Sequence, residues 1–326
     1  MSGSLTASTV NRDAAANYVF NGSTLQTIVK TGTTSIISPF SIPLTITGNV
    51  VIDNPAGVMI SGFNPTINAP GSLIVKSNAQ LLFGTGVTTN TYNINGTGNL
   101  VVESGATLQL TNAAGITNDG LTGSIRLTGS RSFSSNLNFI FTKNDGVNQS
   151  KTGSSFGSEI TSVNNVTFNN PLGSRISGNL TVNGNLTLNQ GLLSLAGSST
   201  LAGSVLVKGN INTLSGSTLD LQGSDAASTL KVQGDVSIGG TLTVTGASTS
   251  SEFQCNGNVS QNLSVTGTVS GNTSLNVNNP NSVIALTNIT LPNASNALLK
   301  LTSGHLNVLQ NNKFVLIQNS VSGAIV

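Results

Sequence analysis

The sequence predicts an all-β protein that folds as a parallel β-solenoid, a stack of coils that each contain a few short strands. The first observation is the stretch from Val166 to Gly197, where apolar residues alternate with Thr, Ser and Asn, as in strands with one buried face. The second is the turn signal between these segments, Asn-Gly or Gln-Gly, because Gly and Asn accept positive φ at little cost. The third is shortness: strands of about four residues are unstable alone and need a repeated stack.

Alternating segments continue along the chain, so we expect strands throughout and no helix. No amphipathic segment of about ten residues is found, and no capping box precedes an apolar run. The segments expected to contain strands are 17–20, 49–62, 72–84, 93–116, 123–135, 138–141, 166–197, 218–246, 262–267, 305–310 and 313–318.

Two echoes in the sequence predict an internal repeat. NYVF at 17–20 returns as NFIF at 138–141, and Asn54-Pro55, with its trailing Ile-Ser-Gly, returns at Asn170-Pro171. The displacements, 121 positions (17 to 138) and 116 positions (54 to 170), are nearly equal. We therefore expect two parts of one continuous rod: a first unit, 1–163, with a polar N-terminal segment, and a second unit, 164–326, with short regular coils.

A hexamer sets the expected coil length. It occurs as TLDLQG, TLKVQG, TLTVTG and NLSVTG, which start at positions 218, 229, 241 and 262. The spacing of these starts favours a coil of about 20 residues with two or three strands. The chain would then form about sixteen coils at the usual strand spacing of roughly 4.8 Å, giving an elongated rod that we expect to be right-handed, with Asn and Thr ladders along its turns.

Composition excludes several classes of partner. Charged residues make up 7 % of the chain, and none lies between Phe253 and Leu299, which a stack of polar rows tolerates better than a globular domain does. The net charge is +2 without a basic run, so we expect no nucleic-acid partner. The apolar runs are far shorter than the roughly 20 residues of a membrane span, so we expect none.

Acidic residues are scattered, so we expect no catalytic, cofactor-binding or metal residues, no cofactor and no enzymatic activity. The closest set is Asp220, Asp225 and Asp235. In a coil of about 15–20 residues, Asp220 and Asp235 would stack about one coil apart and could serve a cation or a polysaccharide-active β-helix enzyme. The alternative, which we favour, is that these carboxylates lie in solvated turns.

Two single residues have ordinary interpretations. Cys255 alternates with Phe253, which predicts a small core residue; the alternative is a reactive thiol. As the only cysteine, it cannot form a disulfide within the chain. His305, the only histidine, stands at a strand start, and we expect no catalytic or metal role for it.

Ligand-binding solenoids are a further alternative. Ice binding needs a flat row of threonines, and TLTVTG supplies the spacing, but TLDLQG and TLKVQG place Asp or Lys where Thr should recur. A glycan site usually offers exposed aromatic rings, whereas Tyr18 and Tyr92 occupy alternating positions expected to face the core.

Several segments together resemble a known family. They are NYVFNGSTLQTI, GTGNLVVESGATLQLTNAAGI, GSIRLTGSRSF, the stretch from Val166 to Leu195, and LLKLTSGHLNVLQNNKFVLIQNSVSG. Over 17–210 and 298–323 the chain resembles the β-strand repeats of very large surface proteins of Bacteroidota that are exported by type IX secretion. The resemblance implies an extracellular, cell-surface adhesin or filament built as a β-solenoid, acting as a stalk and mediating attachment or head-to-tail assembly.

The two ends of the sequence lead to expectations about export and about partners. MSGSLTASTV is unlike a signal peptide, and no sorting domain is recognised at the end, so we expect a cytosolic chain, an excised piece of an exported protein, or a divergent family member. The apolar residues Phe314, Leu316 and Ile325 predict an end covered by further repeats or by another copy, end to end. Surface glycans are additional candidate partners.

Overall fold

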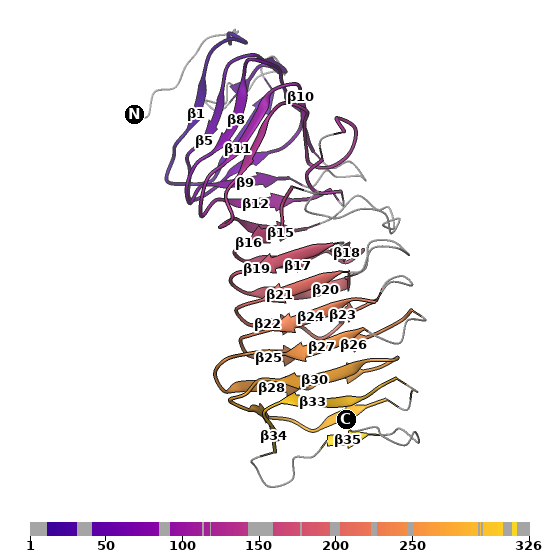
Figure 1. The fold of residues 1–326 in the computed structure, drawn as a ribbon. Helices are drawn as coiled ribbons and strands as arrows, with labels where there is room; N and C mark the ends of the chain where they lie inside the picture. Colours follow the sequence, from indigo (N-terminus) through magenta and orange to yellow (C-terminus); the bar gives the residue numbers. More distant parts are fainter. Residues whose placement is uncertain are drawn as a thin grey trace. The chain divides into compact units, whose positions relative to one another are not determined.

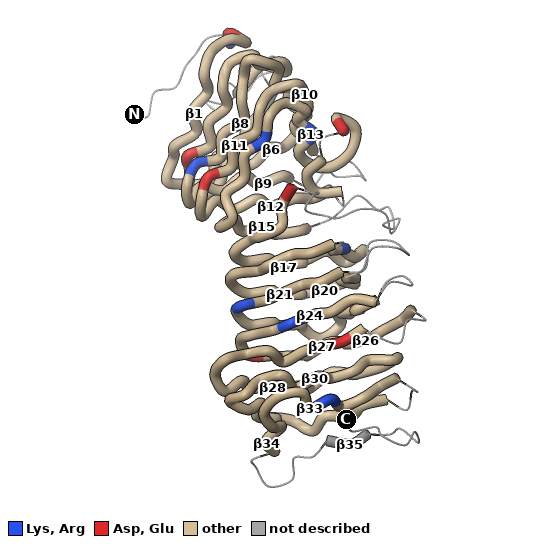
Figure 2. The backbone as a smooth tube through the Cα atoms, in the orientation of Figure 1, with Lys and Arg blue, Asp and Glu red and all other residues tan. Residues whose placement is uncertain are grey.

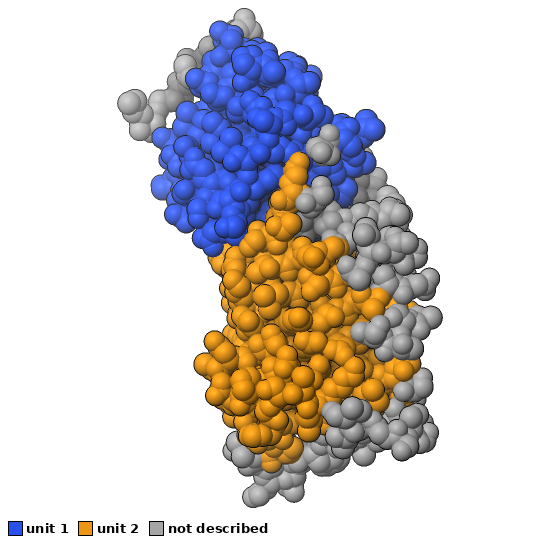
Figure 3. Space-filling model, in the orientation of Figure 1, with its two compact units in different colours: residues 1–146 blue, residues 147–326 orange. Residues whose placement is uncertain are grey.

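The computed structural model describes residues 12–30, 41–84, 92–142 without 113 and 118, 159–195 without 177, 203–222, 227–246, 251–308 without 293 and 295, and 315–317. In these residues the regular structure is entirely β-strand, and no helix is long and apolar enough to cross a membrane. The chain divides into two compact units, Met1–Gly146 and Val147–Val326 (Figure 3), whereas the sequence suggested a boundary at 163/164.

Unit 1 is a parallel stack in which each coil adds one strand to each of three faces. The first face contains β1 (Tyr18–Phe20), β5 (Val50–Ile52), β8 (Ser72–Val75), β11 (Asn99–Val102) and β14 (Arg131–Phe133). The second contains β2 (Gln26–Lys30), β6 (Val58–Ile60), β9 (Gln80–Phe83), β12 (Thr107–Leu110) and β15 (Asn138–Phe141). The third contains β4 (Thr45–Ile46), β7 (Thr66–Ile67), β10 (Ile94–Gly96) and β13 (Ile125–Leu127); β3 (Ser41–Ile42) pairs with the end of β2.

Unit 2 repeats this arrangement (Figure 1). Its first face contains β16 (Ser162–Val163), β19 (Asn179–Val182), β21 (Ser204–Val207), β24 (Thr229–Val232), β27 (Glu252–Cys255), β30 (Ser274–Asn278) and β33 (Leu299–Ser303). The second contains β17 (Val166–Asn169), the start of β20 (Leu186–Ser194), β22 (Ile211–Thr213), β25 (Val236–Ile238), β28 (Gln261–Val265), β31 (Val283–Ala285) and β34 (Leu306–Asn307). The third contains β18 (Ser174–Arg175), the end of β20, β23 (Ser217–Asp220), β26 (Thr241–Thr243) and β29 (Thr268–Val269); β32 (Ile289–Leu291) pairs with β35 (Val315–Ile317). Every strand pair described above is parallel, so the predicted all-β parallel solenoid is confirmed.

In the residues that the structure describes, most coils are longer than the roughly 20 residues that the sequence suggested, and the coils are fewer. Register steps in unit 2 vary from one as short as Ser162 to Thr181 up to one as long as Val236 to Leu263. Counted over the described part of the chain, the first faces of units 1 and 2 hold five and seven strands, so the predicted count of about sixteen coils is wrong. The spacing of the hexamers explains the error in the predicted coil length. Thr218 and Thr241 are register partners one coil apart, but Thr229 between them begins a strand on another face of the same coil.

The two pairs of similar segments that predicted an internal repeat do not lie at equivalent positions of the coil. NYVF lies in β1 on the first face of unit 1, but NFIF is β15 on the second face. Asn54-Pro55 lies between first-face and second-face strands, and Asn170-Pro171 lies between second-face and third-face strands. The similarity is one of turn chemistry, because each asparagine Oδ1 accepts the N–H two residues later and each turn ends on a glycine with positive φ, Gly57 or Gly173.

The interior of each unit is apolar because alternate side chains point inward. Its largest fully buried rings are those of Phe83, Phe139, Phe168 and Phe253. Cys255 is also fully buried, opposite Val277, which confirms the prediction of a core residue. Burial raises the pKa of its thiol to about 12.

Asparagine side chains connect successive coils where second-face strands begin in unit 2. Asn165 Oδ1 accepts the backbone N–H of Asn185 at 2.9 Å, and Asn185, Asn210 and Asp235 each accept the N–H of the next member, at 2.8 Å, ending at Asn262. This asparagine ladder confirms the expectation that Asn rows line the turns. A short amide or carboxylate side chain suits this position, since its oxygen reaches across one strand spacing of roughly 4.8 Å.

Buried amide pairs form a second connection between coils. In unit 2, Asn279 Nδ2 donates to Gln261 Oε1 at 2.8 Å, and in unit 1, Asn54 Nδ2 donates to Gln26 Oε1 at 3.0 Å. Both asparagines are fully buried. Gln261 also donates through Nε2 to the carbonyl oxygens of Val232 and Gly234 on the coil before, so one side chain joins three coils.

Candidate functional site: a polar network across three coils

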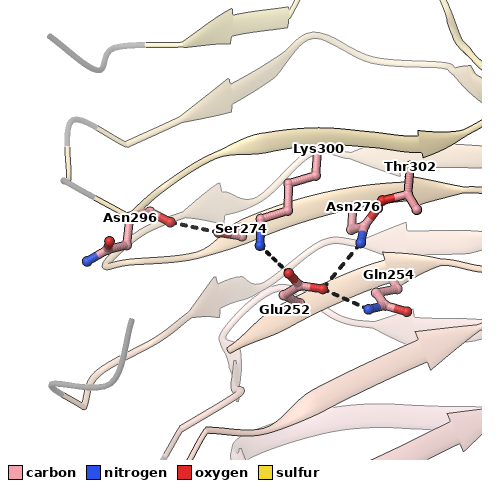
Figure 4. A network of polar contacts seen from close by, with 7 residues as sticks. All are labelled: Glu252, Gln254, Ser274, Asn276, Asn296, Lys300 and Thr302. Carbon is pink, nitrogen blue, oxygen red and sulfur yellow. Dashed lines mark hydrogen bonds and ion pairs between the residues drawn. The ribbon is translucent and has the colours of Figure 1, made fainter. Parts of the chain in front are cut away.

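The network centres on Glu252, the first residue of β27 on the first face of unit 2. Phe253 and Cys255 point into the core, so the alternation of the strand turns Glu252 and Gln254 outward. Glu252 Oε2 accepts hydrogen bonds from Gln254 Nε2 at 2.7 Å and from Asn276 Nδ2 at 3.2 Å. The other oxygen, Oε1, pairs with Lys300 Nζ (Figure 4).

Lys300 lies two coils beyond Glu252, on β33. Its register partner is Asn276 on the intervening strand β30, which in turn pairs with Gln254. The lysine side chain must therefore cross the coil of Asn276 to reach the carboxylate (Figure 4). Thr302 Oγ1 donates to Asn276 Oδ1 at 2.8 Å, so both ends of the asparagine amide are engaged.

The carboxylate is shielded but ionised. The Glu252 side chain is 16 % exposed and that of Lys300 is 30 % exposed. Burial raises the pKa of Glu252, but the hydrogen bonds from Lys300, Gln254 and Asn276 outweigh it, so this pKa lies below its usual value. The site therefore combines an ionised base, an amine and a primary amide within one chain of contacts.

A second ion pair, in unit 1, has a simpler environment. Lys76 Nζ lies 2.7 Å from Glu103 Oε1, and Glu103 Oε2 accepts from the backbone N–H and hydroxyl of Ser77. Both charged side chains are more exposed than those of the network around Glu252. This pair also links consecutive coils, but none of these contacts involves a side-chain amide, which makes the pair a suitable comparison for Glu252.

The structure does not bring Asp220 and Asp235 of the predicted acidic set together. Asp220, on β23, is buried on the third face, where its register partners are Ser194 and Thr243 and its carboxylate accepts from Thr245 Oγ1 at 2.5 Å. Asp235 is exposed and belongs to the asparagine ladder at a different corner. Asp225 lies outside the described residues. The stacking of Asp220 on Asp235 was wrong, because the coil is longer than it required: the register partner of Asp220 on the next coil is Thr243.

The described part of the chain contains no group of three His, Cys, Asp or Glu residues that could hold a metal ion. His305 is exposed, and its backbone oxygen accepts the N–H of Val283 at 2.9 Å.

Sequence reasoning missed the contact between Glu252 and Lys300, which lie far apart in the chain. One signal could have found it: these two charges bracket the uncharged stretch from Phe253 to Leu299. In a stack of coils, two isolated opposite charges are expected to meet on one face when their separation in the sequence is close to a whole number of coils.

No protein-family model, no curated protein and no solved structure matches the chain.

Proposed function

We propose that the chain is a structural extracellular protein, a segment or subunit of a cell-surface adhesin or filament that acts as a stalk. Its partners would be further repeats of the same kind, or further copies, end to end. The observation that supports this proposal most directly is the asparagine ladder, in which one side chain after another bonds to the next coil rather than facing a common pocket.

A stalk has to resist separation of its coils. In each unit the backbone hydrogen bonds between parallel strands run from coil to coil, so a pull along the stacking direction loads them directly. Side-chain bonds such as Asn210 to Asp235 and Asn279 to Gln261 add to this resistance, each by about 0.5–1.5 kcal/mol. Polar side chains in unit 2 thus serve cohesion between coils.

Charged residues are few along the described part of unit 2 (Figure 2). On its second face an outward row runs in register through Thr167, Thr187, Asn212, Ser237 and Ser264. Such a row is solvated without charge and presents no carboxylate pair for acid–base catalysis. It supports a passive structural surface, and we propose no enzymatic role.

Surface location is tested on intact cells of the source organism with an antibody against the purified chain. We expect labelling without permeabilisation, and loss of the labelled antigen after brief protease treatment of whole cells. A cytosolic enzyme of the same cells serves as the control and should stay unlabelled. A signal that requires permeabilised cells would contradict the extracellular proposal.

One observation favours a second candidate, an ice- or glycan-binding solenoid. Thr218, Thr241 and Thr268 stack in register on the third face of unit 2, so a row of three threonines does occur. TLKVQG does not interrupt it because it lies on another face, whereas Asp220 of TLDLQG is in register with Thr243 in the adjacent row. Inhibition of ice recrystallisation, or binding to a glycan array, that is lost in Thr241→Lys but kept in Ser237→Lys would support this candidate.

A further inference from the structure

We propose that Lys300 and Asn276 join through an intramolecular amide bond, formed by the protein itself with Glu252 as the proton carrier. Such a covalent modification does not depend on the proposed function. The proposal rests on the meeting of an amine, a primary amide and a carboxylate from three successive coils of unit 2 (Figure 4).

The geometry provides the reacting groups in the required order. Asn276 and Lys300 are direct register partners, so their Cα atoms are neighbours across one strand spacing, roughly 4.8 Å. Lys300 Nζ is held by one oxygen of Glu252 and Asn276 Nδ2 by the other. The carboxylate therefore touches both the nucleophile and the leaving group of the reaction.

The chemistry is a transamidation that needs no further reagent. The Lys300 ammonium gives a proton to Glu252, and the neutral Nζ attacks Asn276 Cγ, forming an N–C bond. The protonated Glu252 then gives its proton to Nδ2, the Cγ–Nδ2 bond breaks, and ammonia leaves. One of the two protons still on Nζ then passes to the ammonia and the other stays as the amide N–H, so that one ammonium and one secondary amide replace the ammonium of lysine and the primary amide.

The surroundings assist these steps. Thr302 Oγ1 donates to Asn276 Oδ1 at 2.8 Å, where negative charge develops during the attack. Asn276 is 6 % exposed, which limits competition from water. Glu252 begins as a carboxylate, so it has a site for the proton, but its lowered pKa makes the proton transfer from Lys300 the energetically uphill step. By contrast, the ion pair of Lys76 and Glu103 lies beside Ser77, which has no side-chain amide to attack.

The test is the intact mass of the purified, fully denatured 326-residue chain. We expect a mass below that of the sequence by one ammonia molecule, and a proteolytic peptide pair joined at Asn276 and Lys300. Lys300→Arg keeps the charge but lacks the nucleophile, and Asn276→Ala lacks the electrophile, so both should show the full mass. Glu252→Gln removes the base and should also show the full mass, or form the bond far more slowly.

Matched controls separate this bond from other losses of ammonia. Lys231→Arg changes a lysine in the same outward row, and Lys76→Arg changes the other ion pair; both should keep the lighter mass. The proposal would be overturned if the wild-type chain had its full mass in a sample that circular dichroism shows to be folded. So would a loss of ammonia that persists in Lys300→Arg, because it would then come from an asparagine succinimide. Bond formation at the wild-type rate in Glu252→Gln would overturn the role of Glu252.

Discussion

Asn279 Nδ2 donates one hydrogen bond to Gln261 Oε1 at 2.8 Å and another to the carbonyl oxygen of Val259 at 2.7 Å, and the asparagine is fully buried. The same arrangement occurs in unit 1, where Asn54 bonds to Gln26 and to the carbonyl oxygen of Thr24. A position that recurs in both units, with the same two acceptors on the preceding coil, indicates a general device for fixing the register of neighbouring coils.

Asn279→Ala should therefore destabilise the protein by about 1–3 kcal/mol, since it leaves buried acceptors without their donor. The measurement is the free energy of unfolding in urea. Asn281→Ala is the matched control: Asn281 is exposed two positions further on, and its Nδ2 bond to the carbonyl oxygen of Asn258 can be replaced by water. We expect this control to change stability by less than about 0.5 kcal/mol. Equal effects of the two changes would mean that the buried pair contributes no more to the free energy of unfolding than the exposed hydrogen bond does.

The asparagine ladder makes a prediction that separates hydrogen bonding from charge. Asp235→Asn keeps an oxygen that can accept the N–H of Asn262, whereas Asp235→Ala removes it. Thermal unfolding should show no change beyond about 0.5 kcal/mol for Asn and a loss of about 1 kcal/mol for Ala. If Asn were as harmful as Ala, the charge of Asp235 or the hydrogen bond that its Oδ2 accepts from Asn262 Nδ2 at 3.2 Å, and not the bond to the backbone N–H, would hold this step of the ladder.

The ion pair of unit 1 predicts a pH dependence. The hydrogen bond from Lys76 is the main cause that lowers the pKa of Glu103 below 4.5. The stabilisation from Glu103 is therefore complete above pH 4.5 and is lost as pH falls through the lower folded-state pKa. The destabilisation caused by Glu103→Gln should be largest near neutral pH, should shrink in acid, and should also shrink in high salt because water reaches the pair. A pH-independent difference between wild type and variant would contradict this assignment.

Cys255 should not react with thiol reagents in the folded protein. Its thiol is fully buried and its pKa is raised to about 12, so almost no reactive thiolate is present at neutral pH. Labelling with iodoacetamide should proceed only after addition of denaturant, in step with the loss of β-structure. Rapid labelling under native conditions would revive the alternative of a reactive thiol.

Local patterns could predict the strands but not their stacking. The alternation in TLQL, for example, gives the burial seen in β12, with Leu108 and Leu110 inside and Gln109 outside. Which strands become neighbours depends on the lengths of the three connections between the faces of a coil, and these lengths differ. The hexamers at 218–223 and 229–234 therefore looked like successive coils, although they begin on different faces of one coil.

The candidate site depends on that same stacking. Glu252, Asn276 and Lys300 become neighbours only when one coil separates Gln254 from Asn276 and the next separates Asn276 from Lys300, as the structure shows. A shift of the register between these strands by one residue would turn the asparagine or the lysine to the other side of its strand. Cys255 needed no such information, because its burial follows from its alternation with Phe253 within one strand.

The variable length of the coils has a consequence for ancestry. In unit 1, Tyr18 pairs with Val50 and Val50 with Leu73, so the first of these two coils is much the longer, yet the strands stay in register. The architecture thus constrains only the inward side chains and a few hydrogen-bond acceptors at the corners. The intervening residues are free to change in identity and in number. Two such proteins could diverge until no common sequence signal remains while each still winds in the same way, so shared descent among them would be recorded in the pattern of coil-to-coil contacts and not in identity.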